Sequence, residues 1–101
     1  MIQLSDSNFE ALKSEPGIVV IRATAPWCGP CKVLKPIFQE LEQELTSVKF
    51  AELTIDDCPA VTDKLEINSI PTIFFYKDGT LVNTVKGAKP KSYFEGIIKN
   101  L

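Results

Sequence analysis

Two cysteines, Cys28 and Cys31, stand three positions apart at the junction between a predicted strand and a predicted helix. The continuous β-branched run Ile18–Ile21 precedes them and predicts a strand buried on both faces of a sheet. The first turn of a helix has unpaired backbone N–H groups and a positive partial charge, which favour a thiolate placed there. Such a position can lower a cysteine pKa by about one unit or more from about 8.5. Because the thiolate is the species that attacks a disulfide, the pattern predicts a redox motif rather than a structural crosslink.

The segment after the cysteines has the periodicity of an amphipathic helix that ends near Leu45 or Thr46. Its apolar residues recur at spacings of three and four: Leu34, Ile37, Phe38, Leu41 and Leu45. Pro36 lies inside this helix and is expected to kink it.

The other elements are predicted from local patterns. Short strands are expected at Ile2–Leu4, Val48–Ile55, Thr72–Tyr76 and Leu81–Val85, the last two joined by a tight turn at Asp78-Gly79. Helices are expected after a capping box with Ser7 as N-cap and Glu10 as its partner, from Pro59 to Lys64 or Leu65, and from Tyr93 to Leu101. Strands that alternate with helices and end in a hairpin predict an α/β fold, with a central mixed sheet of about five strands and about four helices on both faces.

The composition is that of one soluble domain spanning residues 1–101, with 45% hydrophobic and 24% charged residues. A net charge of −2 argues against nucleic acid or an anionic membrane as the main partner. The chain begins without a basic region followed by an apolar run, so we expect no signal peptide and a cytoplasmic or nuclear location. In such a reducing compartment, three cysteines are expected to be catalytic or free.

Three separated motifs carry a resemblance to a known family. They are Trp27-Cys28-Gly29-Pro30-Cys31-Lys32, Ile70-Pro71-Thr72 and Gly87-Ala88. With them the sequence resembles a thioredoxin over its full length, and the triplet Asp56-Asp57-Cys58 favours the eukaryotic cytosolic type. The resemblance implies the thioredoxin fold and a protein-disulfide reductase. Cys28 would be the exposed nucleophile, and Cys31 would resolve the mixed disulfide.

The resemblance also implies partners and a docking surface. Substrate would bind to a flat apolar surface made by Trp27, Gly29, Pro30, Ile70, Pro71, Gly87 and Ala88, with Pro71 in the cis form. Electrons would come from NADPH through the FAD of a thioredoxin reductase, and substrates would be disulfide-containing proteins such as peroxiredoxins or reductases. The chain has no Gly-x-Gly-x-x-Gly motif and is expected to bind no cofactor itself. It is expected to act as a monomer.

Position 22 departs from the family pattern. Family members usually carry a buried aspartate six residues before the nucleophilic cysteine, whereas this chain has Arg22, and Glu52 lies on the next strand. Arginine stays protonated and cannot exchange a proton with the resolving cysteine. One hypothesis is an inverted ion pair beneath the cysteines, in which Glu52 handles the proton and Arg22 favours the Cys31 thiolate. The alternative is that Arg22 reaches the surface with only its aliphatic stem packed.

The sequence is compatible with other interpretations of the cysteines. A zinc site needs four ligands, but the chain has no histidine and only one further cysteine, Cys58. Cys58 itself is either a small packing residue, expected to be partly exposed beside Pro59, or a regulatory thiol. The fold could also serve a disulfide oxidase or isomerase, or a binding module in which the dithiol is dispensable.

Overall fold

A five-stranded mixed sheet forms the centre of the structure, which is a computed structural model that describes residues 1–101. Its strands are β1 (Ile2–Gln3), β2 (Ile18–Thr24), β3 (Lys49–Thr54), β4 (Thr72–Lys77) and β5 (Thr80–Lys86). They lie in the order β1-β3-β2-β4-β5. The first three run parallel to one another, whereas β4 is antiparallel to both β2 and β5.

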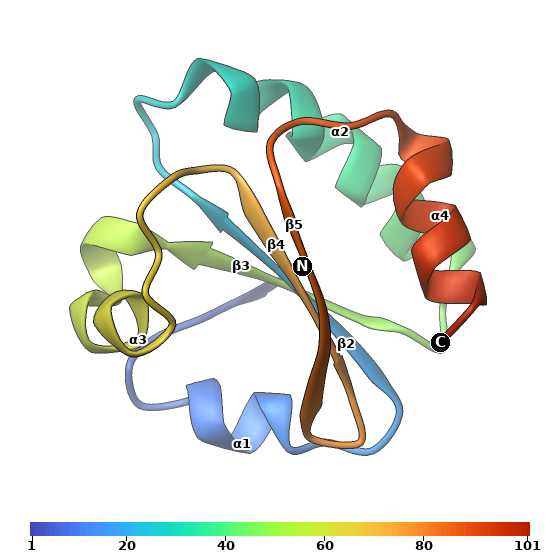
Figure 1. Cartoon of the computed structure of the whole chain (residues 1–101), viewed down its shortest axis with the longest axis horizontal. Coiled ribbons are helices and arrows are strands. Elements are labelled where there is room, and N and C mark those ends of the chain that lie inside the picture. Colours follow the sequence, from blue (N-terminus) through green and yellow to red (C-terminus); the bar gives the residue numbers. More distant parts are fainter.

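Two helices cover each face of the sheet (Figure 1). α1 (Phe9–Lys13) and α3 (Pro59–Lys64) lie on one face, and α2 (Gly29–Glu44) and α4 (Lys91–Lys99) lie on the other. A 3-10 turn, η1 (Ile55–Asp57), connects β3 to α3. This arrangement confirms the predicted α/β class and the predicted order of elements.

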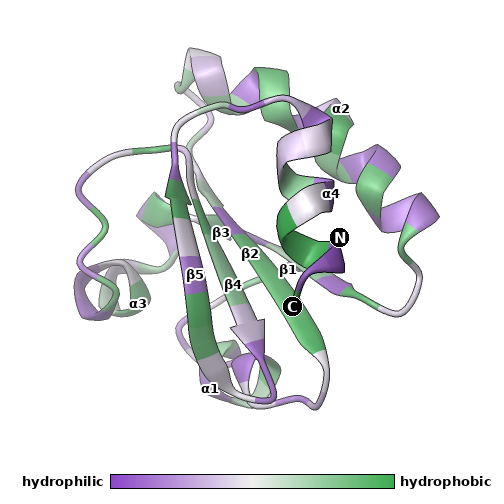
Figure 2. Ribbon diagram, turned by 45° about the vertical axis from the view of Figure 1, so that its right-hand side comes forward, coloured by the Kyte–Doolittle hydropathy of each residue, from purple (hydrophilic) through white to green (hydrophobic).

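The central strand β2 is buried on both sides, as the β-branched run predicted. Val20 belongs to the apolar cluster under α2 and α4, whereas Ile21 and Ala23 belong to the cluster under α1 and α3. Figure 2 shows hydrophobic and hydrophilic residues alternating along α2, as a helix with one buried side requires. Strand β2 is longer than the apolar run and continues through Arg22 to Thr24.

The turn between β4 and β5 agrees with its sequence signature. Asp78 and Gly79 have φ angles of +50° and +85°, the left-handed conformation that both central residues of a type I′ hairpin need. The Asp78 side chain also accepts a hydrogen bond of 2.7 Å from the backbone N–H of Gly17. The hairpin is thereby tied to the loop that enters β2.

The predicted capping box at the start of α1 is wrong. The N-cap residue is Asn8, and its side chain makes no capping hydrogen bond into the helix. Instead, Asn8 Oδ1 accepts from the N–H of Ser5, and Ser5 Oγ accepts from the N–H of Asn8. This reciprocal pair orders the turn before the helix, which leaves Ser7 outside the cap.

Candidate active site

Cys28 and Cys31 lie at the N-terminus of α2, where they form a disulfide with their Cα atoms 5.3 Å apart. Cys28 is the N-cap residue, and its Sγ accepts a hydrogen bond from the backbone N–H of Cys31 at 3.3 Å. Pro30 occupies the first helical turn, where a missing N–H costs no hydrogen bond. When the pair is reduced, the same N–H and the helix dipole stabilise a Cys28 thiolate.

The two cysteines are both shielded from solvent. Cys28 is 6% exposed and Cys31 is 1% exposed. The expectation of an openly exposed nucleophile is therefore wrong for this disulfide form, although Cys28 is the more accessible of the two. The cause is packing, because Ala25, Ile55 and Ile70 lie against the cysteine pair.

The structure brings the predicted docking residues together around the cysteines. Gly87 donates its backbone N–H to the carbonyl of Pro71 at 2.9 Å, which joins the last loop to the loop beside the sulfurs. The Ile70–Pro71 peptide bond is cis, as the resemblance implied. Gly29, Pro30 and Ala88 are exposed, and Ile70 and Gly87 are half-buried. Pro71 is buried, so its ring is not part of an exposed apolar surface as predicted, and its carbonyl is bonded to Gly87.

Trp27 is the large apolar side chain of this surface and is 68% exposed. Its indole N–H donates to Asp56 Oδ2 at 3.4 Å. Asp56 lies in the turn after β3, so this contact crosses from the cysteine loop to the neighbouring strand end. Sequence reasoning missed this role for Asp56, and no local pattern links two residues 29 positions apart.

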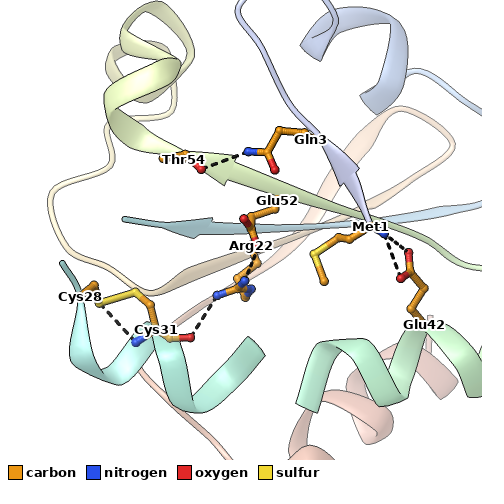
Figure 3. Close-up of polar contacts among 8 residues, drawn as sticks. All are labelled: Met1, Gln3, Arg22, Cys28, Cys31, Glu42, Glu52 and Thr54. Atoms are coloured by element: carbon orange, nitrogen blue, oxygen red, sulfur yellow. Dashed lines mark hydrogen bonds and ion pairs between the residues drawn. A yellow bond between two sulfur atoms is a disulfide. The ribbon is translucent and has the colours of Figure 1, made fainter. Parts of the chain in front are cut away.

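Arg22 and Glu52 form an ion pair beneath the cysteines, as one of the two hypotheses predicted (Figure 3). The two residues occupy matching positions on the parallel strands β2 and β3, so their side chains leave the sheet side by side. Arg22 Nη1 also donates to the backbone carbonyl of Cys31 at 3.1 Å. Arg22 is only 2% exposed, which makes the alternative of a side chain that reaches the surface wrong.

The burial of Arg22 has an electrostatic consequence. Desolvation lowers the pKa of the guanidinium, and the charge of Glu52 and its hydrogen bond act in the opposite direction. Because a guanidinium stays protonated at any accessible pH, the side chain stays positive. The guanidinium also lies 5.9 Å from the centre of the Phe38 ring, where a cation is attracted to the aromatic face.

A cavity of about 270 Å³ opens beside Cys31 and the ion pair. Cys31, Arg22 and Glu52 all line it, with Thr24 and Thr54. The exposed Lys32 and Lys35 of α2 also contribute to its wall. The cavity therefore brings Cys31 of α2 together with the charged Arg22 and Glu52 of the sheet.

Cys58 is separate from this site. It is fully buried in the cluster under α1 and α3, and its Sγ donates to the carbonyl of Leu4 at 3.2 Å. Burial raises the pKa of the Cys58 thiol, and the charges of Asp6 and Asp57 add to the effect. The expected partial exposure is wrong, and the position suits a packing residue rather than an accessible thiol.

The donor set around the sulfurs does not form a metal site. The structure has no group of three or more His, Cys, Asp or Glu side chains arranged to hold a metal ion.

Among its helices, none combines the length and the apolar character that crossing a membrane would need.

A redox-active Cys-x-x-Cys pair at a helix N-terminus, on a mixed sheet covered by helices on both faces, defines a thiol–disulfide oxidoreductase. The family profile described as Thioredoxin matches residues 1–100, and the chain belongs to the thioredoxin family. This chain is therefore a protein-disulfide reductase.

Individual relatives agree with this assignment. The chain is 40% identical over 105 aligned positions to thioredoxin of Sus scrofa, which covers 100% of this chain and 99% of that protein. It is 36% identical over 99 residues to thioredoxin of Bacillus subtilis, covering 97% of this chain and 94% of that one. Since a mammalian and a bacterial protein match about equally well, the eukaryotic cytosolic type stays a prediction.

A solved structure also matches the whole chain. It is reported as the structural basis of the thiol resolving mechanism in yeast mitochondrial 1-Cys peroxiredoxin via glutathione/thioredoxin systems. The TM-score is 0.93 at 30% sequence identity, and the match covers 100% of this chain and 95% of the other. The fold predicted from the resemblance is thereby confirmed.

Proposed function

We propose that a thioredoxin reductase recharges this protein with electrons from NADPH, and that the reduced Cys28/Cys31 pair then reduces disulfides of partner proteins. The observation that carries the proposal is the Cys28–Cys31 disulfide at the start of α2, which is the oxidised product of such a cycle. A reducing compartment such as the cytosol suits this cycle, because thiols are kept reduced there. Peroxiredoxins are proposed as one substrate class, since a similar solved structure concerns a peroxiredoxin and thioredoxin systems.

Each step of the proposed cycle conserves atoms and electrons. The Cys28 thiolate attacks one sulfur of the substrate disulfide, so that a mixed disulfide forms and the other substrate sulfur leaves as a thiolate. The Cys31 thiolate then attacks Cys28 Sγ, which forms the Cys28–Cys31 disulfide and releases the second substrate sulfur. Two electrons pass from the protein to the substrate.

The docking surface is proposed to receive the substrate chain around its disulfide. Exposed Trp27, which donates to Asp56, directly precedes Cys28, and Ile70 of the loop joined to Gly87 packs against the cysteine pair. Exposed apolar surface next to a reactive group marks a binding site. Extended protein segments that carry a disulfide are therefore the expected ligands.

A coupled assay tests the proposed electron source. NADPH, a thioredoxin reductase and insulin are mixed with this chain, and oxidation of NADPH is followed by its absorbance. We expect a rate proportional to the concentration of the chain and no reaction when the reductase is left out. Reduction of insulin with dithiothreitol as donor, but none with reductases of either the bacterial or the mammalian type, would refute the electron route and leave the disulfide chemistry intact.

We also infer that Glu52 accepts the proton of Cys31. The Cys31 thiol must lose its proton before it attacks the mixed disulfide. Of the charged residues that line the cavity beside it, Arg22, Lys32 and Lys35 are cations, and only Glu52 offers a basic carboxylate. Its side chain is 21% exposed, so it can pass the proton on to solvent.

Substitution Glu52→Gln tests this role because it keeps the shape of the side chain and removes the base. We expect the resolution step to slow by about 100-fold and its pH profile to change between about pH 6 and pH 8. The measurement is the rate of mixed-disulfide release at several pH values after rapid mixing. A profile that matches the unsubstituted protein would exclude Glu52 as the proton acceptor.

A further inference from the structure

The Arg22–Glu52 pair has a fixed direction relative to the cysteines. Arg22 Nη1 donates to the carbonyl of Cys31 at 3.1 Å, whereas Nη2 binds the carboxylate of Glu52. The guanidinium therefore lies between Glu52 and Cys31 (Figure 3). The positive end of the pair contacts Cys31 directly, whereas the carboxylate of Glu52 contacts the guanidinium and lines the cavity beside Cys31.

The residues around the pair leave the charge of Arg22 close to Cys31 largely unscreened. Arg22 and Cys31 are almost fully buried, so solvent screens their interaction weakly. Arg22 Nε makes no hydrogen bond to another protein group, which leaves Glu52 as the only anionic partner of the guanidinium. On β4, the other neighbour of β2, the residue paired with Arg22 is the apolar Ile73.

Other charges near Cys31 are few and exposed. From α2, Lys32 and Lys35 line the same cavity, but both side chains are exposed to solvent, which screens them. From β3 the charged group is Glu52, and from β2 it is Arg22. The pair of buried Arg22 and half-buried Glu52 is therefore the main fixed charge arrangement beside Cys31.

We propose that the Arg22–Glu52 pair sets the reduction potential of the Cys28–Cys31 disulfide, with Arg22 favouring the reduced form and Glu52 partly cancelling that effect. Reduction breaks the S–S bond with two electrons and leaves sulfurs that carry negative charge as thiolates, whereas the disulfide is neutral. A nearby cation stabilises the thiolate form, and a nearby carboxylate destabilises it. This proposal adds a control of the reduction potential to the proposed function, and its biological meaning rests on that function.

The experiment is the redox equilibrium of the isolated protein with glutathione, in which two glutathione thiols become one glutathione disulfide as the protein disulfide is reduced. The variants are Glu52→Gln, Arg22→Met, the double substitution and Arg22→Lys, each first checked for folding by circular dichroism. Glu52→Gln is expected to shift the equilibrium roughly tenfold toward the reduced pair, about 30 mV, and Arg22→Met roughly tenfold toward the disulfide. The double variant is expected to lie between them, and Arg22→Lys within about threefold of the original protein.

Opposite signs are the decisive result. Both single substitutions break the same ion pair, so a purely structural role would move the equilibrium in one common direction. Shifts of the same sign, or shifts below about twofold in both, would overturn the proposal. If Glu52→Gln does not fold, Arg22→Met is compared with the double variant, and Arg22→Met must be the more reducing of the two.

This test is independent of the proposed electron route. The glutathione equilibrium involves only the Cys28/Cys31 pair, and it does not depend on proton-transfer rates or on a reductase. Failure of the coupled NADPH assay would leave the predicted shifts measurable, and absent shifts would leave that assay unaffected.

Discussion

Replacing Cys28 by serine is expected to lower the rate of insulin reduction by at least about a thousandfold, because loss of a catalytic nucleophile removes the covalent route. Dithiothreitol serves as the electron donor, and precipitation of the reduced insulin chains reports the reaction. The serine hydroxyl fits the N-cap position, where serine is a preferred residue, so the helix start is expected to remain intact. The loss then reports chemistry rather than unfolding.

Two further cysteine variants sharpen this prediction. With Cys31→Ser, the Cys28 thiolate can still attack a substrate, but no second thiol releases it, so a stable mixed disulfide should accumulate and be visible by mass spectrometry. Cys58→Ser is the control, because Cys58 is buried away from the site and should leave the rate within about twofold. A rate of insulin reduction with Cys28→Ser equal to that of the unsubstituted protein would show that this cysteine is not the nucleophile.

Phe38→Ala is expected to cost about 3–5 kcal/mol of unfolding free energy, the range for truncating a buried phenylalanine. The Phe38 ring is 1% exposed and contacts two other rings, with centroids 6.1 Å from Phe50 and 5.0 Å from Phe94. It thereby joins α2 to both β3 and α4. A loss of that size should lower Tm by at least about 12 °C, measured by thermal denaturation of the reduced protein.

Val33→Ala is the matched control on the same helix. Val33 is 61% exposed, so its truncation should change stability by no more than about 0.5 kcal/mol. A cost below about 1 kcal/mol for Phe38→Ala would mean that the core between α2 and α4 closes around the lost ring.

Most of the fold could be predicted from local patterns. The β-branched run at Ile18–Ile21 predicted the central strand, and the spacing of apolar residues after Cys31 predicted α2 to within about a residue of its end. The Asp78-Gly79 turn followed from the conformation that these residues accept. Such features depend on neighbours along the chain, which the sequence displays directly.

The errors lie where one local pattern is replaced by another contact. Ser7 was expected to cap α1, but the reciprocal hydrogen bonds of Ser5 and Asn8 order that turn instead. Cys58 was expected to be partly exposed because Pro59 follows it, yet it is fully buried in the apolar cluster under α1 and α3, where its Sγ donates to the carbonyl of Leu4. A local rule cannot weigh such packing.

By itself, the sequence determined that this chain has a Cys-x-x-Cys pair at a helix start, an alternating order of strands and helices, and an arginine in an unusual position beneath the motif. The tertiary structure decided what surrounds the cysteines. The parallel register of β2 and β3 sets Arg22 beside Glu52, and α2 packs so that the guanidinium points at the Cys31 carbonyl. Residues separated by 30 positions meet only because sheet register and core packing bring them together, and neither is a property of any single segment.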